Sequence, residues 1–280
     1  MFAEFTHTLR RLRGQIIGWS LGLALFSLMM AFFWEQVLEM EGLQEMIENY
    51  PPELAAFFGG MTAITTPAGY MDTYYFSMMP VIAGIFAVIA GSGLLAADEE
   101  KGVLDLILSH PISRTTLFWS RVLALGVGVA LVMVAGWLGW YLPSLRTSMD
   151  LSALEFLFPF FSLFAVLTLF AALALLFSMV LPAARLAGTL AGALAVANYL
   201  LLGLSNLNPD LASIMEVTPL AYYQGGMAAN GLEGLWVVGL LLVAVLLAAG
   251  AWLLFLRRDI RVGGERSWRL RLPLLRAQRS

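Results

Sequence analysis

Cysteine is absent from this chain of 280 residues, and charged residues are scarce. Without cysteine there is no disulfide framework, no thiolate nucleophile and no zinc site built on cysteine. Asp, Glu, Lys and Arg together make up 12% of the residues, whereas ~25% is usual in a soluble domain. The low charge argues against a soluble protein and directs attention to the apolar residues.

Hydrophobic residues make up 60% of the chain, and the mean hydropathy is +0.82. Charged residues delimit six apolar windows, each long enough for a helix to cross a hydrocarbon core of ~30 Å. The windows do not alternate strictly between polar and apolar residues, which favours helices over a β-barrel. The sequence therefore predicts an all-α polytopic membrane protein with six transmembrane helices in a single domain, residues 1–280. The windows are 14–34, 73–97, 122–145, 156–184, 186–209 and 234–256, and the spans expected within or beside them are 15–34, 74–97, 120–142, 159–180, 186–204 and 234–256.

Basic residues are distributed unevenly between the segments that connect the spans. If both termini face the cytoplasm, 15 of the 16 Lys and Arg residues lie on that side. Segment 35–72 holds seven acids and no basic residue, and segment 209–233 also lacks Lys and Arg. The positive-inside rule thus predicts an N-in, C-in topology with segment 96–122 on the inner face. The first span is expected to be retained, because its apolar run exceeds the 7–15 residues of a signal peptide and ends without a small-residue cleavage site.

Several segments outside the spans carry local signals. Apolar residues at helical spacing between Phe2 and Ile16 predict an amphipathic N-terminal helix, which either lies along the inner leaflet or simply extends the first span. Within the acidic loop, residues 43–50 have helical spacing, and Pro52 is expected to open a short helix. Segment 205–233 is less polar than a free loop and is expected to dip toward the membrane. The basic tail 257–280 is interpreted as an orientation anchor or as a contact with anionic lipids, and nothing else supports a nucleic-acid partner.

Catalytic and energy-coupling groups are missing from the spans. The six windows contain no Asp, Glu, Lys, Arg or His, so the sequence shows no proton relay of the kind that secondary carriers use. There is no P-loop motif for ATP, and His7 and His110 lie too far apart in sequence to form a local metal pair. We therefore expect no catalytic residue, no metal and no cofactor in this chain, and an energy source on a cytoplasmic partner.

The segment AADEEKGVLDLILSHPISRTTLFWSRV, residues 96–122, is the best candidate for contact with such a partner. A helix is predicted over residues 97–108, with three acids at its N-terminal end, where the helix dipole favours them. Pro111 ends that helix and creates an elbow at residues 109–111. Ser113 is expected to cap the next helix, which leads into the third span.

This segment resembles the cytoplasmic signature of ABC-2 type permeases, the membrane subunits of bacterial ABC exporters. A second, weaker similarity is Pro219-Leu220-Ala221-Tyr222-Tyr223 before the last span, and Val103 departs from the Thr that is usual in the signature. The resemblance implies that the segment is a coupling helix between spans two and three, seated in a separate ATPase subunit. The implied coupling residues are Glu99, Glu100, Lys101, Gly102, Leu104, Leu108, Ser109, His110, Pro111, Ile112, Ser113, Arg114 and Leu117.

The resemblance also implies an assembly in the bacterial cytoplasmic membrane. Two ATPase copies would carry ATP and Mg²⁺, and a second permease, identical or related, would complete the pair. The chain would not be an enzyme by itself. Arg114 would form a charge-assisted contact with the ATPase, and Gly102 would allow close approach to a partner backbone.

In the family, spans two and five lie at the central interface, which implies a substrate path there for an amphipathic or apolar cargo. Ordinary helix packing explains any single residue of this set equally well. Two alternatives to an exporter remain, a non-transporting membrane partner of an ATPase that passes force to extracytoplasmic proteins and, less favoured, a secondary carrier. The residues implied for the substrate path are Tyr74, Met78, Phe86, Asn198, Tyr199 and Asn206.

Small residues on span five form two rows at helical spacing and predict close contact with another span. The rows are Ala184, Gly188 and Gly192, and Ala187, Ala191 and Ala195.

Overall fold

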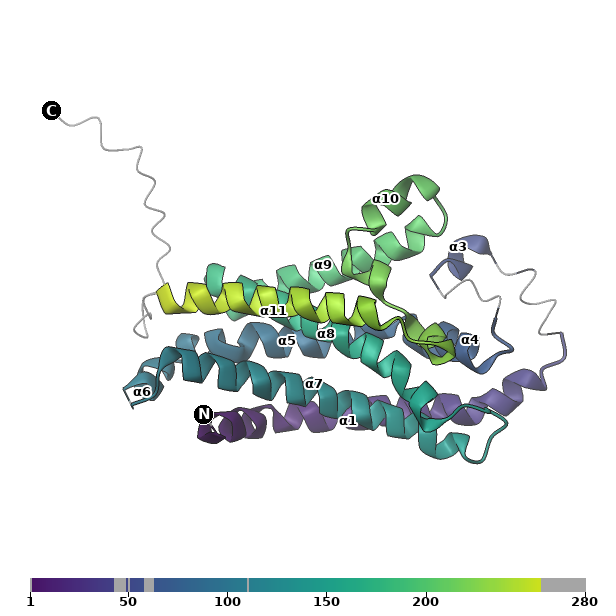
Figure 1. Cartoon of the computed structure of the whole chain (residues 1–280), viewed down its shortest axis with the longest axis horizontal. Coiled ribbons are helices and arrows are strands. Elements are labelled where there is room, and N and C mark those ends of the chain that lie inside the picture. The colour runs from purple at the N-terminus through teal and green to yellow at the C-terminus, as the bar shows by residue number, and fades with distance from the viewer. Residues whose placement is uncertain (1, 43–48, 50, 58–62, 110, 258–280) are drawn as a thin grey trace.

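The computed structural model describes residues 2–42, 49, 51–57, 63–109 and 111–257. Six long apolar helices run side by side through it (Figure 1). Each is long enough to cross a membrane, which confirms the prediction of an all-α polytopic protein with six spans. The helices are α1 (Phe2–Leu38), α5 (Met79–Glu100), α7 (Arg114–Ser144), α8 (Ala153–Val180), α9 (Ala184–Ser205) and α11 (Gly234–Arg257).

Helices α5 and α8 form the centre of the bundle. α1 packs along α7, α11 packs on α8, and α9 packs on both α5 and α8. In the most apolar stretches of α5 and α8, 72% and 67% of the residues are buried, against 22% in α1 and 28% in α9 and α11. The outer helices therefore leave long apolar faces exposed, as expected of helices that contact lipid or another membrane subunit.

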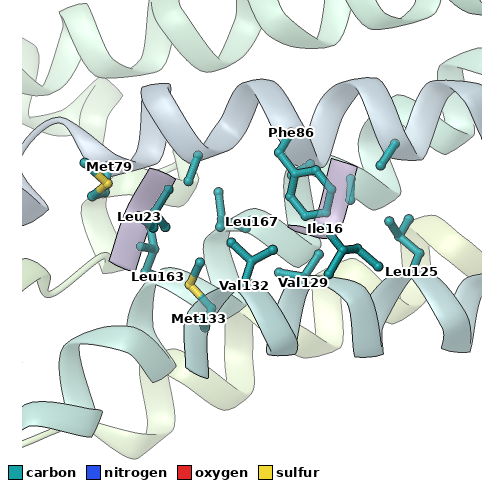
Figure 2. Close-up of a cluster of buried hydrophobic side chains, with 14 of the residues drawn as sticks. Ile16, Leu23, Met79, Phe86, Leu125, Val129, Val132, Met133, Leu163 and Leu167 are labelled. Carbon is teal, nitrogen blue, oxygen red and sulfur yellow. The ribbon is translucent and has the colours of Figure 1, made fainter. Parts of the chain in front are cut away.

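Figure 2 shows the core where α1, α5, α7 and α8 meet. The aromatic ring of Phe86 on α5 points into this core, with its centroid 6.2 Å from that of Trp19 on α1. Aliphatic and methionine side chains of the four helices lie around it. The labelled residues are Ile16, Leu23, Met79, Phe86, Leu125, Val129, Val132, Met133, Leu163 and Leu167.

α1 is one continuous helix of 37 residues. The predicted amphipathic helix therefore extends the first span, which was one of the two alternatives, and no break separates the two parts. At 1.5 Å per residue the helix is ~55 Å long, well beyond a hydrocarbon core of ~30 Å. The buried face of α1 includes Thr8, Leu12 and Ile16 near the N-terminus, so the part of α1 that precedes most of the predicted span packs against protein.

The start of α8 differs from the prediction. The span was expected to begin at Pro159, but the helix begins at Ala153 and Pro159 lies inside it. The reason is a capping box, in which the Ser152 hydroxyl accepts from the Glu155 N–H and the Glu155 carboxylate accepts from the Ser152 N–H. This reciprocal cap satisfies two helix-terminal donors and fixes the start ahead of the proline. The predicted end at residue 180 is confirmed.

The bundle has two distinct ends. The α6 end carries the N-terminus, α6 (Leu104–Leu108) and the last turn of α11, and the α4 end carries α3 (Pro52–Ala55), α4 (Pro67–Met71) and α10 (Ala212–Met215) (Figure 1). α3 opens at Pro52 as predicted. The helical spacing predicted over residues 43–50 falls, apart from residue 49, outside the described residues, as does the basic tail beyond residue 257.

Short helices at the α4 end fold back onto the bundle. They are η1 (Asp72–Phe76), η2 (Pro209–Leu211), η3 (Pro219–Tyr222) and η4 (Gly225–Asn230). η4 packs against α4 and α8, and Leu220, Ala228 and Ala229 are buried. Contact with protein thus accounts for part of the low polarity of segment 205–233, but Leu207, Ile214 and Val217 are exposed, and the predicted dip toward the membrane stays a prediction.

Candidate functional site

The turn between α5 and α6 departs from the single helix predicted over residues 97–108. α5 continues through Glu100, and Gly102 then adopts a left-handed φ of +67°. The Val103 N–H donates to the Asp98 carbonyl at 2.9 Å, and the Gly102 N–H donates to the Glu99 carbonyl at 3.0 Å. This is a Schellman motif, the usual way a helix ends at a glycine. The three acids consequently close α5 and do not open a new helix, so the prediction of a helix start there was wrong.

The second half of the segment matches the predicted elbow. α6 ends at Leu108, and α7 begins at Arg114. The Ser113 hydroxyl accepts from the Thr116 N–H at 3.1 Å, which confirms the predicted cap. His110, in the middle of the elbow, lies outside the described residues.

The apolar residues of α6 divide between two faces. Leu104 is 1% exposed and belongs to the main hydrophobic core, and Ile107 and Leu108 pack against that core. Val103 and Leu106 point outward, with 39% and 67% of their surfaces exposed. One face therefore anchors α6 to its own bundle, and the opposite face exposes apolar side chains at the end of the six-helix bundle. Lys101, Ser109, Pro111 and Ser113 are also exposed.

Two charged residues that flank α6 contact the termini of other spans. The Glu100 carboxylate accepts from the Ala184 N–H at 2.6 Å, and so caps the start of α9. The Arg114 guanidinium donates to the carbonyls of Phe255 and Leu256 at 3.3 and 3.4 Å, near the end of α11. Each charge sits at the helix terminus whose dipole attracts it. Among the predicted coupling residues, these two connect α6 to α9 and α11.

A buried ionic cluster lies just behind the same segment. Asp98 Oδ2 is 2.5 Å from Arg11 Nη1 on α1 and 2.6 Å from Arg121 Nη1 on α7. Both arginines also donate to the Leu94 carbonyl at 2.9 Å. Arg121 is 0% exposed, and its Nε and Nη2 have no hydrogen-bond partner within the described part of the chain.

This cluster ties α1, α5 and α7 together at the α6 end. Removing charges from water costs several kcal/mol per ion, and only close pairing offsets that cost. A shared carboxylate between two arginines therefore holds the three helices in one arrangement. In the sequence, Arg11 contributed to the orientation signal and to the polar side of the N-terminal helix, and Arg121 to the orientation signal. Arg121 and Asp98 each border an apolar window, at 122–145 and 73–97.

The residues predicted for the substrate path lie in three different places. Phe86 is 1% exposed in the core, and Tyr74 packs on Tyr70 with ring centroids 5.0 Å apart. Asn198 is buried and accepts from the Leu220 N–H at 3.1 Å. Met78 precedes α5 and is half-buried, whereas Tyr199 and Asn206 line a small cavity at the α4 end.

An open groove of about 470 Å³ runs between α5 and α9. Ile85, Val88 and Ile89 line it from α5, and Arg185 lies at the end of it where α9 begins. Ala184, Gly188 and Gly192 line the groove from α9, while Ala187, Ala191 and Ala195 are buried in the bundle. The alanine row therefore makes the predicted close contact with other spans of the same chain.

The cavity at the α4 end contains a carboxylate that the sequence did not single out. Asp72 Oδ1 accepts from the Gly226 N–H at 2.7 Å, and burial raises the pKa of this carboxyl to about 6. Asp72 precedes the second apolar window, and the groups that surround it come from segments up to 154 positions away. Its local sequence context gave no signal for such a site.

The comparison with protein families gives one match over most of the chain. A family model described as "Multidrug efflux system permease Rv1217c, C-terminal domain" matches residues 5–256. A search of the curated proteins finds no significant match. The matched range includes all three members of the ionic cluster, the α6 segment and the Asp72 cavity.

Proposed function

The chain belongs to the family of the C-terminal domain of the multidrug efflux system permease Rv1217c, and from this premise we propose that it is the membrane subunit of an ABC-2 type exporter. In this proposal a separate ATPase binds α6 and its flanking residues and drives transport. The observation that carries the proposal is the construction of the α6 end, where a short helix with one exposed apolar face is connected to five of the six spans.

The connections to α6 are of three kinds. The Schellman turn at Gly102 joins α6 directly to α5, and the cap at Ser113 begins α7 a few residues after α6 ends. Glu100 and Arg114 join the flanks of α6 to α9 and α11 by hydrogen bonds. The Asp98 cluster adds α1. A displacement of α6 by a docked ATPase would therefore be shared by most of the bundle at once.

The energy source in this proposal lies outside the chain. The sequence has no P-loop, so ATP and Mg²⁺ would be bound by the ATPase subunits, of which we expect two copies. A second permease, identical or related, would complete the exporter. Transport of an amphipathic or apolar cargo agrees with the groove between α5 and α9, whose walls are mainly apolar. The family description favours transport over the alternative of a membrane partner that only transmits force.

Co-purification with an exposed-site variant tests the docking surface. We expect the tagged chain to capture an ATPase that carries a P-loop, and Leu106→Glu to reduce the captured amount by about tenfold, because a carboxylate would be buried in the contact. Val217→Glu is the matched control, since Val217 is 84% exposed at the α4 end. Equal capture by both variants would rule out the docking role of α6.

The absence of cysteine allows a direct test of the topology. Ser109→Cys and Val217→Cys each introduce a single thiol at an exposed position, one at each end of the bundle. We expect a membrane-impermeant maleimide to label the Val217→Cys protein in intact cells and the Ser109→Cys protein only after permeabilisation. Labelling of Ser109→Cys from outside would remove any cytosolic ATPase from contact with α6.

Measurement of transport separates an exporter from a force-transmitting partner. The captured complex, reconstituted in liposomes, is expected to hydrolyse ATP faster in the presence of an amphipathic cargo and to move that cargo across the bilayer. ATP hydrolysis without movement of any tested cargo would favour the force-transmitting alternative.

A further inference from the structure

A small cavity with a single carboxylate lies at the α4 end between η1, α9 and the chain that leads into η4. Its volume is about 160 Å³. Phe57, Ser77, Tyr199, Asn206 and Tyr223 line it together with Asp72. Asp72 is the only one of its lining residues that carries a charge, so the cavity has a net negative character.

The backbone around Asp72 fixes the carboxylate in place. Oδ1 accepts from the Gly226 N–H, while Oδ2 has no hydrogen-bond partner among the described residues. Gly225 has a left-handed φ of +54°, and a Cβ at Gly226 would overlap the Asp72 backbone. The close approach of these glycines holds one carboxylate oxygen and leaves the other with capacity to accept further donors.

The hydrogen-bond donors in the cavity wall are largely used inside the protein. Asn206 Nδ2 donates to the Ala56 carbonyl at 2.7 Å, and the Tyr223 hydroxyl donates to the Phe76 carbonyl at 2.9 Å. The Ser77 hydroxyl donates to the Thr73 carbonyl at 2.8 Å. Beside Asp72, the wall contains the rings of three aromatic residues, Phe57, Tyr199 and Tyr223.

The aromatic rings and the surrounding charge favour the same kind of ligand. The rings of Phe57 and Tyr199 have centroids 6.1 Å apart, and Tyr223 adds a third ring to the wall. Aromatic faces attract organic cations through their quadrupoles. Segments 35–72 and 209–233, which form this end, contain acids but no Lys or Arg, and such a field raises the local concentration of cations.

We propose that this cavity binds the ammonium group of an organic cation, with the Asp72 carboxylate as counter-ion and the three rings as walls. The volume is below the ~300 Å³ at which drug-sized sites begin, so the cavity takes a small ammonium ion or only the head of a larger molecule. Ca²⁺ fits poorly, because it needs six to eight oxygen ligands and the wall offers one carboxylate among aromatic rings.

The link between this site and transport rests on the function proposed above. In that function, organic cations would be among the transported molecules and would pass the α4 end. Binding itself does not depend on that function. An experiment on the purified chain alone, without ATPase and without transport, therefore tests the site separately from the exporter.

Saturation-transfer NMR on the full chain in nanodiscs provides the test. The probes are choline and its neutral isostere 3,3-dimethylbutan-1-ol, which differ in charge at nearly constant shape. We expect transfer to choline at pH 7.5, about tenfold weaker binding of the neutral alcohol, and a loss of choline binding at pH 5 as Asp72 is protonated. The other titratable groups that face Asp72 are Tyr199 and Tyr223, and phenols are neutral at both pH values.

Variants locate the binding. Asp72→Asn keeps an acceptor for the Gly226 N–H but removes the charge, so choline should bind about tenfold more weakly. Tyr199→Leu removes one ring and should weaken choline binding to a smaller extent. Glu216→Gln makes the same change of charge at the same end outside the cavity and should bind choline like the parent.

Two results would overturn the proposal. One is equal binding of choline and the neutral alcohol by the parent protein. The other is undiminished choline binding by Asp72→Asn while Glu216→Gln behaves like the parent. If Asp72→Asn does not fold, as judged by size-exclusion chromatography, the comparison of the two probes and of the two pH values on the parent decides the question.

Discussion

Asp98 and Asp72 lie near the two ends of α5, and the protein holds these two carboxylates in opposite ways. Asp98 contacts two arginines, at 2.5 and 2.6 Å, and helps to close the α6 end. Asp72 accepts one backbone N–H and has no cationic partner among the described residues. Both side chains are shielded from water to a large degree, so the difference lies in how the charge is compensated.

The comparison shows how one residue type serves two purposes. The charge of the Asp98 carboxylate is compensated by two arginines, both at Oδ2, and this pairing holds α1, α5 and α7 together. A carboxylate with one neutral donor and no paired cation keeps a raised pKa and an uncompensated charge, which is the condition for binding a proton or a cation. The α6 end is thus built for rigidity, and the α4 end keeps unused binding capacity.

The largest effect should follow from breaking the ionic cluster at the α6 end. Asp98→Ala leaves Arg121 buried without its counter-ion, which costs about 3–5 kcal/mol and should strongly reduce the yield of folded protein. Thermal unfolding of the purified protein measures the loss. Asp150→Ala, at an exposed position, is the control, and an equally small change in both variants would contradict a structural role for the cluster.

An intermediate effect is expected from the hydrogen bond that attaches segment 219–230 to α9. Asn198→Leu leaves the Leu220 N–H without its acceptor, and a buried donor of this kind costs about 1–3 kcal/mol. Hydrogen exchange in residues 219–230 should accelerate. Thr189→Val, on the exposed side of the same helix, should leave that exchange unchanged, so acceleration in both variants would point to damage of α9 as a whole.

A smaller loss is expected at the Schellman turn. Gly102→Ala forces a side chain into a left-handed conformation, which costs about 1–2 kcal/mol, and should lower both the melting temperature and the capture of ATPase. Gly93→Ala is a matched change within α5, where a Cβ would make only an ordinary contact. If Gly102→Ala were as stable as Gly93→Ala, the turn would not be fixing α6.

The smallest change in melting temperature should come from Asp72→Asn, and this variant should be more stable than the parent, whereas the three variants above should be less stable. The folded pKa of about 6 lies above the ordinary value, so the stabilisation from this carboxyl is present at low pH and is lost as the pH rises through about 6. The variant should therefore melt at the same temperature as the parent at pH 3, which lies below both pKa values, and a few degrees higher at pH 7.5. A variant that is destabilised more at pH 7.5 than at pH 3 would show that the charge is compensated after all.

The helices were largely predictable, because long apolar windows and caps are local signals. All six spans and the cap at Ser113 followed from composition and spacing alone. The end of α5 was misplaced, because the dipole argument for three acids outweighed the glycine at position 102, whose left-handed turn could have been recognised as a helix end.

The charged sites were not predictable from local patterns. The pairing of Arg11 with Asp98 joins positions 87 residues apart, and the contact of Asp72 with Gly226 joins positions 154 apart. Such contacts depend on which helices are neighbours, and the hydropathy of single segments does not determine this. Tyr199 and Asn206 were chosen for a path at the interface of spans two and five, and the fold instead places them beside Asp72.

The length of α1 has a consequence for how this protein responds to its membrane. A free helix that exceeds the hydrocarbon thickness relieves the mismatch by tilting. Here the N-terminal turns are tied to α5 through Arg11, so the angle of α1 is set by the protein and not by the lipid. Thinner or thicker bilayers should accordingly tilt the bundle as a whole or deform around it, and acyl-chain length becomes a variable to which reconstituted activity is sensitive.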